Sequence, residues 1–161
     1  ENKNKVGVNT HFTNKIVKEA LEKGLIHLFD KKVNFQSEKK FNKNTRFDFF
    51  LKNKLKGVFI EVKNVTLKRK RNLAEFPDAV TSRGLKHLKE LIRAKNMGYD
   101  SCLFFLIQRN DCDTFKIASD IDLDYFENLK IAIKNKVKII AYNCKFLKNG
   151  IVINKKVRIK I

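Results

Sequence analysis

The spacing of apolar residues changes along the chain, and each change predicts a new element. Residues 13–29, "TNKIVKEALEKGLIHLF", carry apolar side chains at helical spacing, with Thr13 in the position of an N-cap. Shorter apolar segments rich in Phe, Ile and Val come next and are typical of strands. These strand-like segments cover residues 33–41, 46–52 and 57–67.

The second half of the chain predicts two more helices and three more strands. "FPD" (76–78) begins a helix with Asp78 as candidate N-cap, and Gly98 suits the position after its end near Met97. The almost wholly apolar "SCLFFLIQ" (101–108) is typical of a central strand that is buried on both faces. The remaining elements are a helix over 122–135, capped by Asp122, and strands near 137–146 and 151–161.

The order of the elements, α-β-β-β-α-β-α-β with the strand near 151–161 following it, predicts a three-layer α/β fold around a mixed sheet. A length of 161 residues suits a single domain, residues 1–161, and 43% hydrophobic residues provide for a sizeable core. No apolar run is long enough to span a membrane, and the polar N-terminus lacks the apolar segment of a signal peptide. Three cysteines without a CxxC pair indicate reduced, buried thiols, so we expect a cytoplasmic protein.

The formal net charge of +19 changes the functional picture, because the 36 Lys and Arg residues face only 17 Asp and Glu residues. A charge this large attracts polyanions, and a nucleic acid is the default partner of such a protein. The coding bias of an AT-rich genome also produces many lysines. It does not explain why acidic residues are so few, so we expect contact with nucleic acid.

Candidate chemistry lies in "TRFDFFLKNKLKGVFIEVKNVTL" (45–67), where two carboxylates and a lysine occur among sheet-forming residues. The two strands of this segment are expected to form a hairpin, and a loop with an even number of residues places Asp48 directly opposite Glu61. Cross-strand neighbours have Cβ atoms about 4.5–5.5 Å apart. Lys63 follows Glu61 by two residues and so projects from the same face. An odd loop would shift the register by one residue and separate the two acids.

Two carboxylates this close repel each other unless a cation lies between them. The pattern therefore predicts a Mg²⁺ or Mn²⁺ site with Asp48 and Glu61 as ligands, where the metal polarises a phosphodiester. Lys63 would orient the attacking water and stabilise the developing charge. The alternative is a solvent-facing hairpin with an incidental ion pair. The apolar neighbours favour the site, because acids are rarely buried in a sheet without a partner.

Several segments of the chain resemble the C-terminal domain of the sugar fermentation stimulation protein family. They are "GVNT" (7–10), "RFDFFL" (46–51), "FIEVKNVTL" (59–67), "FPDAVTSRGLKHLKEL" (76–91), "FFLIQR" (104–109) and "AYNCKF" (141–146). The resemblance covers nearly the whole chain and implies a DNA-binding protein with the PD-(D/E)xK fold, a restriction-endonuclease-like nuclease core. Family members carry an oligonucleotide-binding-type (OB-type) β-barrel before this domain, and we expect this chain to lack it.

By position, the resemblance assigns the first acid of the nuclease motif to Asp48, the second to Glu61 and the lysine to Lys63. Phe47 replaces the proline of the motif, a departure that matters little because only the acid reaches the metal. A literal "PD" occurs at 77–78, but no strand-borne ExK follows it, so we interpret its acid as a helix cap.

Two further acids are candidate metal ligands. Nucleases of the fold that the resemblance implies have an acid on the first helix, and Glu19 occupies that position. Glu38 lies in the strand before Asp48, where the turn decides its orientation. A three-residue turn puts Glu38 on the Asp48 face, and a four-residue turn puts it on the other face.

Two basic groups predict contacts with the phosphate backbone of a nucleic acid. One is the expected loop "LKRKRN" (67–72), and the other is a helix face near a helix N-terminus, where backbone N–H groups also favour phosphate. A solvated loop and a solvated helix face are the alternatives. The predicted nucleic-acid-binding residues are Lys68, Arg69, Lys70, Arg71, Arg83, Lys86 and His87.

The leading hypothesis is a cytoplasmic, nucleoid-associated DNA-binding protein that uses Mg²⁺ or Mn²⁺ to hydrolyse phosphodiester bonds. The alternatives are a regulatory DNA-binding protein with a vestigial nuclease site and a basic protein–protein module of a larger nucleoprotein assembly. The intact Asp48, Glu61 and Lys63 favour catalysis, because a protein that only binds DNA gains nothing from acids that face it.

Overall fold

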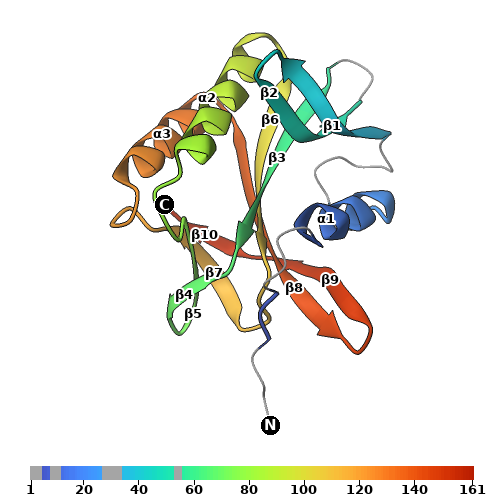
Figure 1. The fold of residues 1–161 in the computed structure, drawn as a ribbon, viewed down its shortest axis with the longest axis vertical. Helices are drawn as coiled ribbons and strands as arrows, with labels where there is room; N and C mark the ends of the chain where they lie inside the picture. Colours follow the sequence, from blue (N-terminus) through green and yellow to red (C-terminus); the bar gives the residue numbers. More distant parts are fainter. Residues whose placement is uncertain (1–4, 8–11, 27–33, 53–55) are drawn as a thin grey trace.

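The computed structural model describes residues 5–7, 12–26, 34–52 and 56–161. These residues form a mixed α/β fold with three helices and ten strands (Figure 1). The helices are α1 (Phe12–Glu22), α2 (Ser82–Asn96) and α3 (Leu123–Lys134). The strands are β1 (Phe35–Asn42), β2 (Thr45–Leu51), β3 (Val58–Val65), β4 (Leu67–Lys70), β5 (Asn72–Phe76), β6 (Asp100–Ile107), β7 (Cys112–Ile117), β8 (Lys138–Leu147), β9 (Gly150–Lys156) and β10 (Arg158–Lys160). Within the described residues, no helix is long and apolar enough to cross a membrane.

The strands form two mixed sheets instead of the single sheet that the sequence predicts. The larger sheet has six strands in the order β1-β2-β3-β6-β8-β9, and β3, β6 and β8 run parallel at its centre. The smaller sheet has four strands in the order β10-β7-β5-β4. As predicted, residues 101–108 supply the central strand, because β6 is buried over nearly its whole length between β3 and β8.

Helices cover both faces of the six-stranded sheet, which gives the three layers that the element order predicts (Figure 1). On one face, α2 and α3 bury apolar side chains such as Leu88 and Leu129 against the sheet. On the other face, α1 buries Ile16 and Val17. Central parallel strands need apolar residues on both faces because each face is covered.

Alternation along β3 decides which of its side chains face which layer. Ile60 and Val62 pack in the core beneath α1, whereas Phe59 and Val65 pack in the core beneath α2 and α3. Side chains two residues apart in a strand share a face. Glu61 and the residues around it with odd numbers therefore face the layer that contains α2.

The predicted basic loop at 67–72 is wrong, since these residues form β4 and the start of β5. The sequence did not reveal these strands because their charged residues hide any apolar alternation. β5 is held by β7, a partner about 40 residues further along the chain, and Ala74 is fully buried there. The next helix is capped by the side chain of Thr81, which accepts from Gly84 N, while the predicted cap Asp78 is exposed.

Other predicted boundaries need smaller corrections. The first helix ends at Glu22, before Gly24 with its φ of +66°, and residues 27–33 lie outside the described part of the chain. Thr13, predicted as its N-cap, lies inside the helix and is buried. Gly98 with φ of +89° and the Asp122 cap that accepts from Tyr125 N are both confirmed. The strand expected over residues 151–161 is divided into two. Its first part, β9, belongs to the larger sheet, and its second part, β10, pairs with β7 in the smaller sheet.

All three cysteines are free and buried, as the sequence predicts. Cys102 lies on the central strand β6 and is fully buried. Burial raises the pKa of the Cys102 thiol to about 12. These thiols are therefore small apolar core residues.

Candidate active site

The β2–β3 hairpin has the register that brings Asp48 and Glu61 together. Phe49 pairs with Ile60 and Leu51 with Val58, so one further step along the same register sets Asp48 opposite Glu61. The hairpin tip, residues 53–55, lies outside the described part of the chain. The paired residues on either side of it nevertheless have the register that an even loop predicts.

Phe49 is the last residue of β2 whose backbone pairs with β3, and at Asp48 the side-chain carboxylate replaces the backbone hydrogen bonds. Its Oδ2 accepts a hydrogen bond of 2.7 Å from Val62 N, and its Oδ1 accepts one of 2.8 Å from Asn14 Nδ2 on α1. The two strands can therefore separate here without leaving the Val62 N–H unsatisfied. Asn14 was not foreseen, because nothing in its local sequence distinguishes it from a solvated helix residue.

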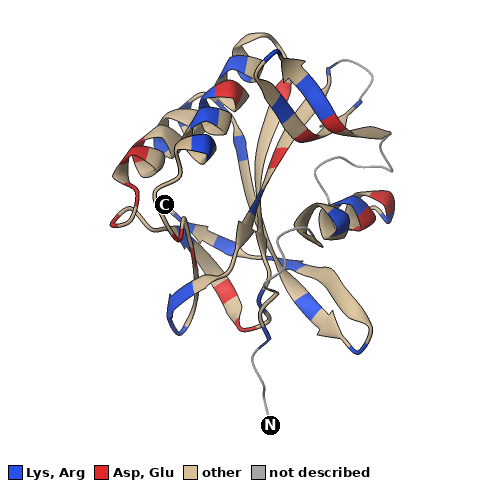
Figure 2. Cartoon of the chain, in the orientation of Figure 1, with Lys and Arg blue, Asp and Glu red and all other residues tan. Residues whose placement is uncertain are grey.

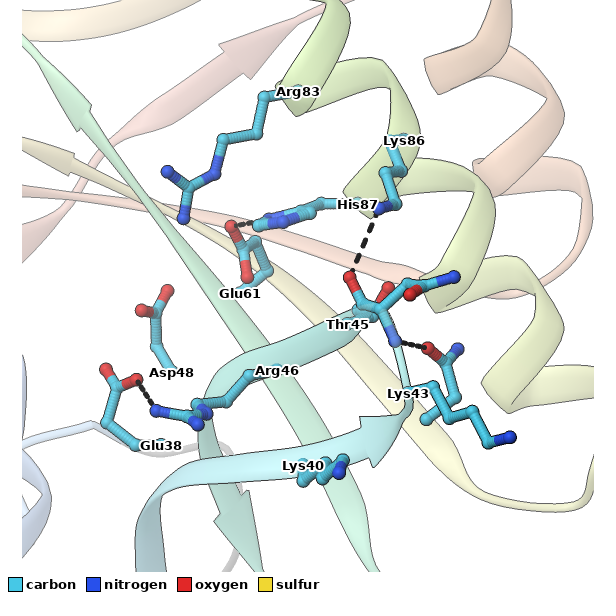
Figure 3. Close-up of a pocket in the computed structure, with 12 residues that line it drawn as sticks. Glu38, Lys40, Lys43, Thr45, Arg46, Asp48, Glu61, Arg83, Lys86 and His87 are labelled. Atoms are coloured by element: carbon cyan, nitrogen blue, oxygen red, sulfur yellow. Dashed lines mark hydrogen bonds and ion pairs between the residues drawn. The ribbon is translucent and has the colours of Figure 1, made fainter.

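Glu61 is 4% exposed, and its two oxygens have different surroundings. Oε1 lies 2.8 Å from Lys63 Nζ. It is also hydrogen bonded to His87 Nδ1 on α2 (Figure 3). Oε2 is buried and has no hydrogen-bond partner among the described residues. A buried carboxylate oxygen without a partner is costly, so it marks a place where a further group is expected to bind.

The two carboxyl groups have pKa values shifted in opposite directions. Burial, and then the charge of Glu61, raise the pKa of Asp48 to about 6, against the smaller opposing effects of its hydrogen bonds and of Lys63. Burial alone would also raise the pKa of Glu61, but the hydrogen bond from His87 and the positive charge of Lys63 outweigh it and lower that pKa. Such opposed pKa values on neighbouring acids are typical of functional sites.

The protein side chains at this site can supply part of the coordination shell of a divalent cation. The described residues contain no group of three or more His, Cys, Asp and Glu side chains that could hold a metal ion together. The pair Asp48 and Glu61 offers two carboxylates, one with a free oxygen. Mg²⁺ is commonly bound by one or two carboxylates and otherwise by water and phosphate oxygens, so this donor set fits it.

Two cavities meet at Asp48, Glu61 and Arg83, which line both. The hairpin cavity has a volume of about 570 Å³ and lies between the β1–β2 hairpin and α2; its other lining residues are Glu38, Lys40, Asn42, Lys43, Asn44, Thr45, Arg46, Lys86 and His87 (Figure 3). The helix cavity has a volume of about 340 Å³ and lies beside the start of α1; its other lining residues are Thr13, Asn14, Val62, Lys63 and Asn64.

The two additional acids have different positions. Glu38 faces the hairpin cavity, because Ser37 pairs with Phe49 and Lys39 with Phe47, which sets it opposite Asp48. The turn before β2 has two residues, with a register shift nearby, and so matches neither of the expected lengths. The structure does not bring Glu19 to this site. It lies five residues after Asn14, on another face of α1, and pairs with Lys23.

The helix residues predicted to bind nucleic acid lie at the site. Arg83 extends from α2 toward the two carboxylates, and Lys86 lines the hairpin cavity (Figure 3). His87 is 8% exposed and is engaged with Glu61, so it supports that carboxylate instead of presenting a surface contact. The sequence placed His87 near the site but could not show its partner on β3.

The four residues predicted from the basic segment lie on the β4–β5 hairpin and line neither cavity. Lys68 pairs with Asp111, and Arg69 pairs with Glu75 and Asp120. The turn of this hairpin is coloured as basic in Figure 2, and Lys70 and Arg71 are exposed. Two of the four cations are therefore engaged with acids inside the fold, which the sequence could not reveal.

Comparison with known proteins finds relatives that match nearly the whole chain. Residues 11–150 match the family model described as the sugar fermentation stimulation protein RE domain. A sugar fermentation stimulation protein homolog from Pelagibacter ubique is 50% identical over 157 residues, which are 98% of this chain and 68% of that protein. A homolog from Rhodospirillum centenum is 41% identical over 155 residues, which are 96% of this chain and 66% of that protein.

A solved structure has a similar fold. The structure of Pyrococcus furiosus SfsA in complex with Ca²⁺ has a TM-score of 0.86 and 24% sequence identity, and the match covers 96% of this chain and 66% of that chain. The chain thus spans about two thirds of the length of these relatives. The two mixed sheets and three helices described above correspond to that shared fold.

Proposed function

Because the chain belongs to the sugar fermentation stimulation protein family, we propose that it is a nuclease that hydrolyses phosphodiester bonds with a divalent metal ion held by Asp48 and Glu61. One observation carries the proposal: the buried Glu61 Oε2 has no partner and lies in a site that it shares with the Asp48 carboxylate. The negative charge of Glu61 contributes to the raised pKa of Asp48, and two carboxylates this close are unfavourable together unless a cation binds between them. The complex of Pyrococcus furiosus SfsA with Ca²⁺, another cation that prefers oxygen ligands, supports the same inference.

Asp48 and Glu61 would hold the metal, and water and phosphate oxygens would supply the other ligands. Mg²⁺ or Mn²⁺ at this position would polarise the phosphodiester and lower the pKa of a water. Asn14 and the Val62 N–H hold the Asp48 carboxylate in place, and His87 holds Glu61. Groups that orient a ligand in this way are part of what makes a metal site effective.

Lys63 and Arg83 would act on the substrate itself. Lys63 Nζ lies 2.8 Å from Glu61 Oε1, so its ammonium is held beside the reacting position, where it would orient the attacking water and stabilise negative charge. An ammonium group has no lone pair and is not a metal ligand. Arg83 lines both cavities at their junction and would bind the phosphate that is cleaved.

The order of the main elements supports a PD-(D/E)xK core. With β4, β5, β7, β9 and β10 as additions, the remaining elements follow the predicted order α-β-β-β-α-β-α-β. Asp48 on β2 and Glu61 and Lys63 on β3 then correspond to the motif that the family resemblance implies. We propose DNA as the substrate on the basis of the net charge of +19 and this resemblance.

A regulatory DNA-binding protein with a vestigial site is the second candidate. One observation favours it: the described residues contain no group of three or more side chains that could hold a metal together, and Glu61 Oε1 is already engaged by Lys63 and His87. Such a protein would bind DNA without cutting it. The two candidates therefore differ in a single measurable property, which is metal-dependent cleavage.

The test is cleavage of single-stranded and double-stranded DNA with Mg²⁺, with Mn²⁺ and with a chelator. We expect cleavage only with metal. Asp48→Asn should lower the cleavage rate by at least about a hundredfold, since removing a metal ligand lowers activity more than removing a group that orients a ligand. Lys63→Ala should lose cleavage to a similar extent but keep metal binding, measured by calorimetry. Asp113→Asn, an exposed acid outside both cavities, is the control. A parent protein that binds DNA but never cuts it would support the regulatory candidate.

A further inference from the structure

The two cavities that meet at the carboxylates differ sharply in charge. Apart from the residues that both share, the hairpin cavity contains one acid, Glu38, and four cationic side chains, from Lys40, Lys43, Arg46 and Lys86. The helix cavity contains one, Lys63, and its remaining polar side chains are neutral. The protein therefore presents a cationic surface on one side of the carboxylate pair and a mostly neutral polar surface on the other.

The cations of the hairpin cavity are largely available to a ligand. Lys40 and Lys43 are exposed, and neither forms an ion pair or hydrogen bond with an acid among the described residues. Arg46 makes one ion pair of 3.8 Å with Glu38, and both of these side chains are more than half exposed. Exposed pairs of this kind contribute little to stability, so Arg46 can exchange its partner at small cost.

Hydrogen bonds fix the distance between the two walls of this cavity. Lys86 Nζ on α2 donates to Asn44 O at the turn of the β1–β2 hairpin, at 3.1 Å. Asn42 Nδ2 at the end of β1 donates to Glu90 Oε2 on α2, at 2.6 Å. The hairpin is thus tied to the helix that carries Arg83, and its cations are held in position before a ligand binds. Such preorganisation lowers the entropic cost of binding.

The helix cavity has the groups needed to contact a neutral part of a ligand. Asn14 uses its Nδ2 on Asp48, and Asn64 uses its Oδ1 to accept from Gln108 Nε2 at 2.6 Å. Each amide therefore retains one polar atom, an acceptor on Asn14 and a donor on Asn64. Amides can hydrogen bond to bases and sugars, whereas cations bind mainly to phosphates.

We infer that a nucleic-acid strand lies across the site with a fixed orientation, its phosphodiester backbone bound on one side of the carboxylates by the β1–β2 hairpin and α2. Lys40, Lys43 and Arg46 are the new contacts, opposite Lys86 and Arg83. The adjoining nucleoside on the other side enters the helix cavity. This inference rests on the proposed function, since it specifies how the proposed substrate binds at the same site.

The test measures binding without cleavage. A fluorescent single-stranded oligonucleotide of about 12 nucleotides is titrated by anisotropy, in chelator and at several salt concentrations, with the parent chain and with the triple variant Lys40→Gln, Lys43→Gln, Arg46→Gln. We expect the slope of log affinity against log salt to fall by about 0.7 for each lost contact on a single strand, or about 2 in total. At low salt the affinity should fall by about tenfold or more.

A control variant removes the same charge elsewhere: Lys134→Gln, Lys148→Gln, Lys160→Gln. These three exposed lysines line neither cavity, so their removal should leave the salt slope nearly unchanged. All six positions of the two variants are exposed, and thermal unfolding will verify that both proteins remain folded. The single variant Lys43→Gln should lower the slope by about 0.7.

The outcomes separate this inference from the proposed function. Equal losses in the two triple variants, or no loss in the hairpin variant, would overturn the inference and leave the proposed nuclease in place. A parent chain that does not bind the oligonucleotide at low salt would overturn both. Binding of the parent with a slope that falls only in the hairpin variant would support the inference, whether or not the protein cuts DNA.

Discussion

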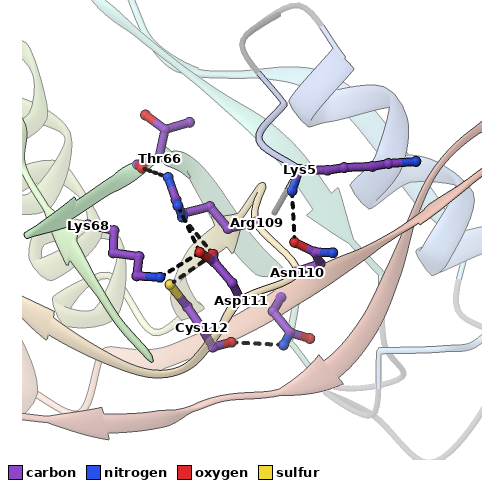
Figure 4. A network of polar contacts seen from close by, with 8 residues as sticks. Lys5, Thr66, Lys68, Arg109, Asn110, Asp111 and Cys112 are labelled. Carbon is purple, nitrogen blue, oxygen red and sulfur yellow. Dashed lines mark hydrogen bonds and ion pairs between the residues drawn. The ribbon is translucent and has the colours of Figure 1, made fainter. Parts of the chain in front are cut away.

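Two carboxylate clusters on this protein have similar burial but opposite degrees of hydrogen bonding. In the Asp111 cluster, formed by Lys68, Arg109 and Asp111, Arg109 Nε lies 2.8 Å from Asp111 Oδ1, and Lys68 Nζ lies 2.5 Å from Oδ2 (Figure 4). Both carboxylate oxygens are therefore paired with cations. In the candidate active site, Glu61 Oε2 has no hydrogen-bond partner in the part of the chain that the structure describes.

The pKa values follow this difference. Hydrogen bonds from Arg109, together with Lys68, lower the pKa of Asp111 far below its ordinary value. Burial and the charge of Glu61 raise the pKa of Asp48 to about 6. Bidentate pairing with an arginine is among the strongest contacts that a carboxylate makes, so the Asp111 cluster is complete as it stands.

Burial of an acid does not by itself indicate function. Asp111 links the end of β6 to β4 through two cations that pair with both of its oxygens, which is a structural role. Asp48 and Glu61 remain short of positive charge although the chain carries a net charge of +19. The completed cluster and the incomplete one should therefore respond differently to substitution and to pH.

The largest effect is expected from Asp111→Asn, which should destabilise the protein by about 3 kcal/mol because it leaves two poorly exposed cations without their acid. The side chains of Arg109 and Lys68 are only 15% and 18% exposed. Urea unfolding gives the free energy of unfolding. Asp113→Asn, an exposed acid two residues away, is the matched control and should change it by less than about 0.5 kcal/mol. Equal stability of the two variants would mean that the Asp111 cluster is not structural.

A smaller effect of opposite sign is expected from Asp48→Asn. In chelator at pH 7.5, this variant should be more stable than the parent by about 1 kcal/mol. Removing the ionised carboxylate relieves its burial and its repulsion from Glu61, which outweighs the loss of one of the two hydrogen bonds that Asp48 accepts. Divalent metal should raise the melting temperature of the parent but not that of the variant. A variant that is less stable than the parent in chelator would contradict the view that this site lacks positive charge.

The pH dependence provides a second measurement on the same two acids. The folded protein holds a proton on Asp48 below pH 6, whereas the unfolded chain loses it near its ordinary pKa of 3.8. Lowering the pH through 6 should therefore stabilise the parent in chelator and remove the advantage of Asp48→Asn near pH 4. The pKa of Asp111 is lowered on folding, so its contribution is present above about pH 4 and is lost as the pH falls further.

The smallest effect is expected on DNA binding, from removing the two exposed cations at the turn of the β4–β5 hairpin. Removing the charge of the exposed Lys70 and Arg71 should weaken binding to DNA by about two- to fivefold per residue, to the same extent for every DNA sequence. Lys68→Gln should leave binding unchanged and instead lower stability, since Lys68 is engaged with Asp111. Anisotropy with two unrelated DNA sequences, together with urea unfolding, checks both. Weaker binding in Lys68→Gln would show that this lysine is not committed to the fold.

How far the sequence predicts the site depends on how far apart its residues lie in the chain. Asp48, Glu61 and Lys63 belong to one hairpin, and alternation together with an even loop was sufficient to place them on one face. Asn14 and His87 come from separate helices, 34 residues before Asp48 and 26 residues after Glu61. No local pattern records such a contact, because it depends on how α1 and α2 pack against the sheet.

Short-range patterns in the sequence were sufficient to predict the order of the main elements, the central strand β6, the buried thiols and the shared face of the two acids. These features follow from periodicity and composition over short stretches. Packing in three dimensions was needed to establish that β5 and β7 pair in a second sheet, that Lys68 binds Asp111, and that Glu19 lies away from the site. Each of these depends on pairing between distant segments, where packing and charge neutralisation select one partner among many that local sequence permits.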